Sequence, residues 1–210
     1  MAKRRMTIFT HHPQCELDCA FAMASILEKD FIVKIITIAE LTPATLDQTD
    51  VLAFGGGIGD ADDFDDIFKP WHYKLVRAWV ANGGKYLGIC MGAYWAGKHY
   101  FDLLGGINVV QYIKTPDSDI NTEFETIAKV TYSNETVNMY FYDGCAFDIY
   151  SLKETDEVWA TYANNYPMAI QHYNVGAIGC HPEAKKWWHE AIGGYNKNAK
   201  QFLREFAYSL

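Results

Sequence analysis

The segment 85–96 constrains the fold of this chain more than any other part of its sequence. It reads as a short apolar strand that ends in the pattern Gly-x-Cys-x-Gly around Cys90, followed at once by the start of a helix. A nucleophile elbow requires such glycines, because a Cβ at Gly88 or Gly92 would collide with neighbouring backbone. The elbow puts the sulfur at a helix N-terminus, where the dipole favours thiolate over thiol. The segment predicts a strand-turn-helix corner that presents a nucleophile or, alternatively, buries a cysteine.

Segments with the character of strands and helices alternate through the first half of the chain. Each expected strand is apolar on both faces, whereas helical segments carry apolar residues at helical spacing. Pro70 opens one helix, and the glycines after Ala81 end it. This alternation is typical of a parallel sheet covered on both sides by helices. The expected strands are 6–10, 31–38, 50–54 and the one that leads to Cys90, and the expected helices are 16–29 and 70–81.

The second half of the chain has a different pattern, in which apolar and polar residues alternate more clearly. Segments of this kind, joined by short polar turns, indicate antiparallel strands at a sheet edge or in an accessory sheet. The run 175–180 returns to the continuous apolar pattern, and 196–209 has the pattern of an amphipathic helix. The alternating strands are 124–131, 136–142, 157–162 and 168–173.

These patterns predict a three-layer α/β/α sandwich with a doubly wound, mostly parallel sheet and some antiparallel edge strands. A chain of 210 residues, half of them hydrophobic, can fill one domain, and we expect a single domain over 1–210. The functional site of such a fold lies at the carboxyl ends of the parallel strands.

Composition and charge exclude several classes of function. A net charge of -8 argues against a face that binds phosphate backbones, and the aromatic residues are not interleaved with Lys or Arg. No stretch approaches the roughly 18 apolar residues of a membrane span. Five irregularly spaced cysteines do not suggest a disulfide framework. We therefore expect a cytoplasmic protein that binds neither nucleic acid nor membrane and that keeps its thiols reduced.

A cysteine nucleophile needs a base to take its proton and a third group to hold that base. His181, Pro182 and Glu183 supply both, directly after a buried strand. The proline fixes the local direction of the backbone, so that Glu183 can turn back to the ring nitrogen of His181 that faces away from the sulfur. The predicted catalytic residues are Cys90, His181 and Glu183.

Acyl transfer also needs backbone donors for a developing oxyanion. Three glycines, Gly55, Gly56 and Gly57, close the third strand and are a natural source of such donors. The amide of Met91 follows the nucleophile and can supply another. We expect Gly56, Gly57 and Met91 to form the oxyanion hole, and Gly55 to lie beside the substrate.

The glycine run, the segment 88–92 and the end Cys180-His181-Pro182-Glu183 together resemble the class I glutamine amidotransferase family. The resemblance covers most of the chain, in the expected order and spacing. It implies a doubly wound α/β domain with a Cys-His-Glu triad. The segments 84–96 and 142–145, with the His-Pro-Glu end, are most similar to the amidotransferase-like N-terminal domain of eukaryotic biotin-protein ligases and its free-standing relatives.

One position departs from the pattern of this family. Members that use glutamine usually carry glutamine four residues after the nucleophile, where it helps to hold the substrate. This chain has Tyr94 there, as the biotin-ligase-like domains do. The resemblance therefore implies an intact triad but leaves open whether free glutamine is the substrate, and we expect Tyr94 to contact the substrate. The chain contains no synthetase domain to receive ammonia, so an amidotransferase role would need a separate partner subunit.

The sequence predicts an enzyme: an amidotransferase-like hydrolase or transferase that acts on an amide or γ-glutamyl-type bond of a small molecule. Cys90 forms a thioester, His181 moves the proton and Glu183 orients His181. No metal or organic cofactor is required, and a homo-oligomer is compatible with the sequence. The alternative is a non-catalytic or weakly catalytic binding or regulatory module of the biotin-protein ligase N-terminal type. A third possibility keeps the nucleophile and uses it on a peptide or ester.

Two further clusters have competing interpretations. Aspartates crowd the segment 60–66, either as a solvated acidic loop or as a loop that attracts a cationic group of the substrate. Two histidines, His11 and His12, precede Cys15 and Cys19, which would share a face of a helix. That group could bind a metal, could contact substrate through His11 or His12, or could simply pack in the core.

Two more segments carry residues that the triad does not use. Cys145 lies in a segment that the resemblance brings close to the site, and we expect it to line the pocket. Trp187 and Trp188 follow the triad carboxylate and are expected to pack in the core or to form a subunit contact.

Overall fold

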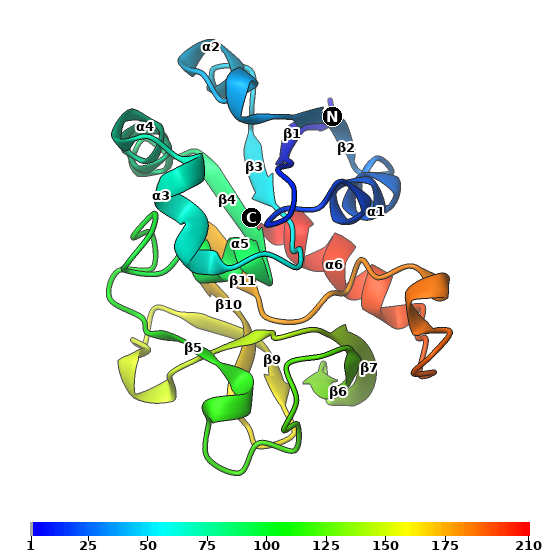
Figure 1. Cartoon of the computed structure of the whole chain (residues 1–210). Coiled ribbons are helices and arrows are strands. Elements are labelled where there is room, and N and C mark those ends of the chain that lie inside the picture. Colours follow the sequence, from blue (N-terminus) through cyan, green and yellow to red (C-terminus); the bar gives the residue numbers. More distant parts are fainter. Residues whose placement is uncertain (1) are drawn as a thin grey trace.

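A nine-stranded sheet runs through the molecule, as seen in a computed structural model that describes residues 2–210 (Figure 1). Its strand order is β2-β1-β3-β4-β11-β10-β9-β6-β7, and β5 pairs with β8 in a separate two-stranded sheet. The strands are β1 (Arg4–Phe9), β2 (Phe31–Ile36), β3 (Val51–Phe54), β4 (Lys85–Ile89), β5 (Val109–Gln111), β6 (Thr126–Tyr132), β7 (Glu135–Phe141), β8 (Cys145–Phe147), β9 (Glu157–Tyr162), β10 (Pro167–His172) and β11 (Val175–Ile178).

The parallel half of this sheet contains β2, β1, β3, β4 and β11. The inner strands β3, β4 and β11 are buried on both faces, because successive side chains point to opposite sides of the sheet, whereas the edge strand β2 exposes Ile32 and Lys34. In β3, for example, Val51 and Ala53 enter one hydrophobic cluster, whereas Leu52 and Phe54 enter another. The continuous apolar runs in the sequence follow from this double burial.

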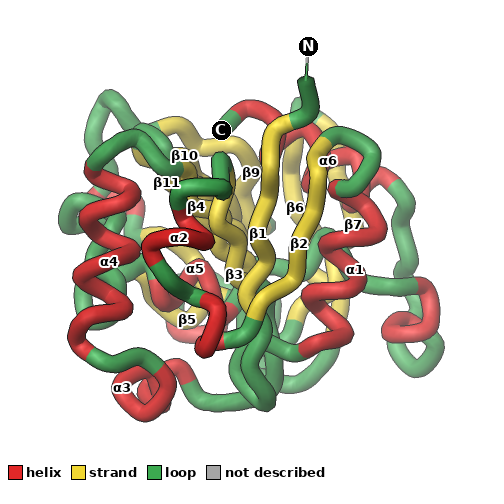
Figure 2. The backbone as a smooth tube through the Cα atoms, turned by 90° about the horizontal axis from the view of Figure 1, so that it is seen from above, coloured by secondary structure: helices red, strands yellow, loops and turns green. Residues whose placement is uncertain are grey.

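Helices cover both faces of the sheet, which gives three layers (Figure 2). Helices α1 and α6 lie on one side, and α2, α3 and α4 lie on the other. The predicted three-layer α/β/α fold is therefore confirmed. The helices are α1 (Leu17–Leu27), α2 (Pro43–Leu46), α3 (Phe64–Ile67), α4 (Pro70–Ala81), α5 (Met91–Trp95) and α6 (Asn198–Ser209), with short 3-10 turns at Ile38–Glu40, Ala61–Asp63, Tyr112–Lys114, Ile149–Ser151 and Lys186–His189.

The antiparallel strands extend the same sheet rather than forming an accessory one. Strand β10 pairs antiparallel with β11, and β9, β6 and β7 continue the sheet in antiparallel steps to its edge. Of the two positions that the alternating pattern allowed, the structure adopts the sheet edge. The small β5–β8 pair was not predicted, because each strand has three residues and is too short to show a period.

Helix α1 begins within one residue of its expected start, and Cys15 lies outside it. Its first residue is Leu17, with Glu16 at the N-cap. Cys15 therefore precedes the helix, where its backbone exchanges hydrogen bonds with that of His11. The expectation that Cys15 and Cys19 share a helical face was wrong.

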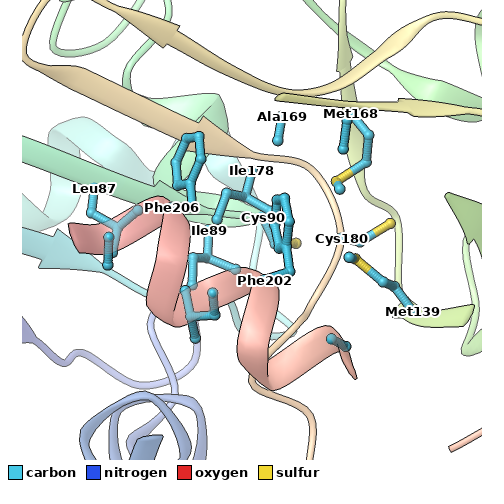
Figure 3. Close-up of a cluster of buried hydrophobic side chains, with 14 of the residues drawn as sticks. Leu87, Ile89, Cys90, Met139, Met168, Ala169, Ile178, Cys180, Phe202 and Phe206 are labelled. Atoms are coloured by element: carbon cyan, nitrogen blue, oxygen red, sulfur yellow. The ribbon is translucent and has the colours of Figure 1, made fainter. Parts of the chain in front are cut away.

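The core next to the elbow is built from α6 and the central strands. Phe202 and Phe206 of α6 face Ile89 of β4 and Ile178 of β11, and Cys90 lies at the end of this row (Figure 3). The carboxyl ends of β4 and β11 thus support the segment that carries the sulfur. Among residues 2–210, no helix has both the length and the apolar composition needed to cross a bilayer.

Candidate active site

Cys90 occupies a strained corner between β4 and α5. Its φ is 51°, in the left-handed region that residues with a Cβ rarely adopt, and the next residue, Met91, begins α5. A Cβ on Gly88 would overlap the carbonyl of Gly92, and a Cβ on Gly92 would overlap the carbonyl of Phe54. The two glycines are therefore required by close approach of backbone, as the sequence predicted. The geometry is that of a nucleophile elbow.

His181 and Glu183 follow β11, the strand next to β4 in the sheet. A hydrogen bond from the His181 amide to the Tyr140 carbonyl ties the start of this segment to β7. The Nδ1 atom of His181 lies 2.9 Å from Oε1 of Glu183, and the side chains are 4% and 0% exposed. This is the pairing that the His-Pro-Glu sequence predicted.

Gly56 brings the histidine and the cysteine together. A Cβ built on Gly56 would overlap the ring of His181 and would also touch the Cβ of Cys90. Both side chains therefore pack against the same glycine, which no other residue could replace without moving them. The Cys90 sulfur donates to the Tyr142 carbonyl at 3.5 Å. Among the described residues, the Nε2 atom of His181 is buried and has no hydrogen-bond partner.

The electrostatics of the site distinguish His181 from its surroundings. Burial by itself would lower the pKa of His181, but the negative charge of neighbouring Cys90 and Glu183 outweighs it and raises that pKa well above its usual value. Burial also raises the pKa of the other four thiols, to about 11 for Cys19 and about 12 for Cys180. Those four cysteines stay protonated at neutral pH.

A cavity of about 720 Å³ opens onto Cys90. Gly57 and Met91 line it beside the sulfur. Within residues 2–210, the backbone N–H groups of Gly57 and Met91 donate to no protein acceptor, whereas those of Ile58 and Gly59 both donate to Pro13. Two backbone donors are thus available next to Cys90, and Gly56 lies behind them against His181. This arrangement can receive a carbonyl oxygen that gains negative charge.

Tyr94 forms part of the cavity wall, one turn of α5 beyond the sulfur. Its hydroxyl donates to the carbonyl of Asp143 at 3.1 Å. The Asp143 carboxylate accepts from Gln111 at 2.9 Å and also lines the cavity. Burial raises the pKa of Tyr94, so its hydroxyl remains a donor. Tyr94 therefore has its polar end engaged by the loop that also contacts Cys90, and it presents its ring to the cavity.

The acidic segment 60–66 divides into two parts. Asp60 and Asp62 are exposed and line the cavity, and Asp62 accepts a hydrogen bond from Tyr100 at 2.6 Å. The exposed Asp65 and Asp66 are not part of the cavity lining. Only the first part of the segment can influence a molecule that enters the cavity.

Three residues expected near the substrate lie outside the lining of this cavity. Gly55 is buried against Cys19 and Met23 of α1. Cys145 is fully buried at the start of β8, and His11 stacks on Phe9. Closeness in sequence to a lining residue, as of Gly55 to Gly57 and of Cys145 to Asp143, does not place a residue in the cavity wall.

The proposed metal group before α1 does not assemble around its histidines. His12 is exposed and pairs with Glu16, while Cys15 is buried and donates to the Gly55 carbonyl at 3.3 Å. Trp188 packs against Tyr140 at the end of the sheet, which agrees with core packing.

The structure adds contacts that the sequence did not predict. Gln14 donates to Asp63 at 2.6 Å and packs against Gly59, so it supports the loop that carries the Gly57 donor. Cys19 of α1 lies beside His181 and Glu183, and its sulfur is close to a ring nitrogen of the histidine and a carboxylate oxygen of the glutamate. Neither contact has a local signature, because the partners are far apart in the sequence.

Solved structures of proteins named as glutamine amidotransferases share this fold, at identities that establish the fold alone. A glutamine amidotransferase from Thermotoga maritima aligns over 100% of this chain and 98% of its own, with a TM-score of 0.70 and 15% identity. A chain of PurLQS from Thermotoga maritima aligns over 99% of both chains, with a TM-score of 0.64 and 13% identity. A candidate GMP synthase subunit from Thermoplasma acidophilum covers 100% and 98%, with a TM-score of 0.58 and 17% identity.

Residues 11–108 match the family described as biotin-protein ligase, N terminal. The predicted resemblances to the glutamine amidotransferase family and to the biotin-protein ligase N-terminal branch are both confirmed. The matched range contains Cys90 and Tyr94 and ends before His181 and Glu183. A comparison with curated protein sequences finds no significant match.

Proposed function

We propose that the protein is a cysteine-dependent hydrolase or transferase that acts on an amide or γ-glutamyl-type bond of a small molecule. The observation that carries this proposal is the packing of Cys90 and His181 against Gly56, with Glu183 bonded to Nδ1 of the His181 ring. A nucleophile, a base and an orienting carboxylate in this order form the minimum set for acyl transfer.

The chemistry follows from these positions. The Cys90 sulfur attacks the carbonyl carbon as His181 takes the thiol proton, and the N–H groups of Gly57 and Met91 stabilise the oxyanion. Collapse of this intermediate breaks the C–N bond, His181 gives its proton to the leaving nitrogen, and a thioester remains on Cys90. Water or an amine, deprotonated by His181, then attacks the thioester and releases the thiol. No step needs a metal or an organic cofactor.

The proposal includes a substrate other than free glutamine, because Tyr94 fills the wall position and has its hydroxyl engaged by the Asp143 carbonyl. It also includes a synthetase-type partner that would receive ammonia. Two proteins of similar fold are named PurLQS and GMP synthase subunit, and these names support the expectation of a synthetase-type partner.

Alkylation of the cysteines tests whether Cys90 is an activated thiol. We expect iodoacetamide at neutral pH to modify Cys90 much faster than the other four cysteines, whose pKa values are raised by burial. Replacing His181 with alanine should slow Cys90 modification at least about tenfold, since the imidazolium that stabilises the thiolate is lost. Mass spectrometry of peptides after timed quenching gives the rate at each cysteine.

The matched control is His99→Ala, which removes a histidine from the same cavity. It should leave the rate at Cys90 within about twofold of the wild type, because a lone exposed charge at this range acts only weakly. If Cys90 reacts no faster than the other cysteines, the enzymatic proposal is wrong. A mass increase on Cys90 after incubation with a metabolite extract would identify the acyl group.

One observation favours a second function, a binding or regulatory module without efficient turnover. The hydrogen bond of the Cys90 sulfur goes to the Tyr142 carbonyl, and Cys90 is only 4% exposed. A thiol held in this way is less available to His181. The same alkylation experiment decides between the two functions, because a module of this kind needs no activated thiol.

The effect of the acidic residues that line the cavity can be tested by modifying Cys90 with charged reagents. We expect a cationic methanethiosulfonate reagent to modify Cys90 faster than an anionic one, and Asp60→Asn with Asp62→Asn to reduce that ratio about two- to fourfold. The control pair, Asp65→Asn with Asp66→Asn, changes the net charge equally but lies outside the cavity lining. Equal effects of the two pairs would show that the loop is only a solvated face.

A further inference from the structure

Cys19 is buried beside the two residues that the proposed function uses as base and orienter. It is a buried residue of α1. Its Cβ lies so close to Gly55 that a Cβ added to that glycine would contact it. Its sulfur, one ring nitrogen of His181 and one carboxylate oxygen of Glu183 all lie within 4.8 Å of one another. The three residues are 5%, 3% and 0% exposed. The reaction proposed above gives Cys19 no role.

The polar atoms of this cluster are not fully satisfied by the protein. Among residues 2–210, Nε2 of His181 and Oε2 of Glu183 are buried and have no hydrogen-bond partner. Buried polar atoms without partners are costly, and each one in a folded protein calls for an explanation. A ligand that accepts electron pairs from these groups would remove the cost.

One thiolate, one imidazole and one carboxylate are the donors that a zinc ion prefers. Zinc bonds of about 2.0–2.3 Å separate two ligands on a tetrahedral ion by roughly 3.3–3.8 Å. Pairs at the 4.8 Å limit must close by about 1.0–1.5 Å, whereas Nδ1 of His181 and Oε1 of Glu183, at 2.9 Å, must move slightly apart if both bind the ion. Calcium and magnesium are poor occupants, since they take six or more oxygen ligands.

Charge also favours a divalent cation at this place. A thiolate on Cys19, a carboxylate on Glu183 and a neutral His181 carry two negative charges, which one divalent ion balances. A neutral assembly can stay buried at little electrostatic cost, whereas an isolated ion cannot. Binding releases the thiol proton of Cys19 to solvent. The fourth ligand position can be filled by water or by the sulfur of Cys90, a residue whose Cβ packs on Gly56 beside His181.

We propose that Cys19, His181 and Glu183 bind a zinc-like divalent cation that reversibly blocks the chemistry of Cys90. A metal ion on either ring nitrogen of His181 removes the base. If the ion takes the nitrogen that faces Cys90, no lone pair is left for the thiol proton. If it takes the other nitrogen, the one facing Cys90 carries the ring proton and cannot accept another. The blocking effect depends on the function proposed above, while the binding does not.

The test measures binding and reactivity separately, in the full chain freed of metal. Zinc binding is followed by competition with a chromophoric chelator, and cobalt binding by the absorption band of a thiolate–cobalt bond. We expect one equivalent of zinc per chain and a cobalt band. Cys19→Ser should weaken zinc binding more than about tenfold and remove the cobalt band. Cys15→Ser, a buried cysteine nearby whose sulfur bonds to Gly55, should change neither.

Reactivity is measured as the rate of Cys90 alkylation with and without zinc, each variant being compared with its own metal-free rate. We expect zinc to slow Cys90 alkylation at least about tenfold in the wild type, a chelator to restore it, and the effect to shrink in Cys19→Ser. Cys19→Ala is the second variant, for the case that the buried serine disturbs the fold.

Three results would overturn the metal proposal. They are the absence of zinc binding at micromolar concentrations, unchanged binding in both Cys19 variants, and loss of binding in Cys15→Ser equal to that in Cys19→Ser. A low rate of Cys90 alkylation together with a cobalt band that depends on Cys19 has a different meaning. It contradicts the proposed function and supports the metal site.

Discussion

Replacing Glu183 with glutamine is expected to slow the alkylation of Cys90 at neutral pH by about 10- to 100-fold. The change keeps the shape of the side chain but removes its negative charge from a partner 2.9 Å away that is almost completely buried. A hydrogen bond to a charged group contributes about 1.5–3 kcal/mol, and it is the imidazolium of His181 that gains this stabilisation when the thiol proton is transferred. Rates from timed alkylation and mass spectrometry check the prediction.

The chain provides a matched control in a second buried carboxylate–histidine pair. Asp156 lies 2.6 Å from Nδ1 of His172, and their side chains are 0% and 8% exposed. This pair packs near Gly105 and Lys153, away from the cavity at Cys90. Asp156→Asn should therefore lower the free energy of unfolding without changing the Cys90 rate. If both variants slow Cys90 equally, the effect of Glu183 is a general loss of stability and not an orientation of the base.

The parts of the site that could be predicted from the sequence depend on short spacing. Gly88 and Gly92 lie two residues on either side of Cys90, and Glu183 lies two residues after His181, so local geometry alone brings each set together. The parallel strands were also predictable, because burial on both faces leaves continuous apolar runs in the sequence. Pairing of β4 with β11 then joins the two local sets across the sheet.

The rest of the site depends on long-range packing that a single sequence does not encode locally. Cys19 meets His181 because α1 packs across the ends of the central strands, and their positions differ by 162 along the chain. Gly55 was expected near the substrate as part of the glycine run, and Cys145 because of the resemblance, but tertiary packing buries both outside the cavity lining.

The departure at Tyr94 shows how sequence and structure complement one another. Resemblance to the amidotransferases indicates that a substrate-holding residue is absent at this position, but not what the tyrosine does. The structure shows its hydroxyl bonded to the Asp143 carbonyl, next to the Tyr142 carbonyl that contacts Cys90. Tyr94 thus supports the cavity wall, and the proposal of a substrate other than free glutamine rests on this contact.

The largest expected effect on stability is that of Gly92→Ala, which should lower the free energy of unfolding by about 3 kcal/mol or more. The added Cβ would overlap the carbonyl and Cβ of Phe54 in β3, and a strand buried on both faces cannot move away. Helix α5 would have to shift, and it begins directly after Cys90. Urea denaturation of the variant and the wild type measures the difference.

A different glycine separates this collision from the ordinary cost of losing a glycine. Gly83 has a φ of +96°, yet nothing lies within 4 Å of the Cβ that alanine would add there. Gly83→Ala should therefore lose only about 1–2 kcal/mol, from backbone strain. Gly92→Ala should exceed that loss and also disturb the alkylation of Cys90, which Gly83→Ala should leave unchanged. Equal losses in the two variants would contradict the close approach of β3 and α5 on which the elbow depends.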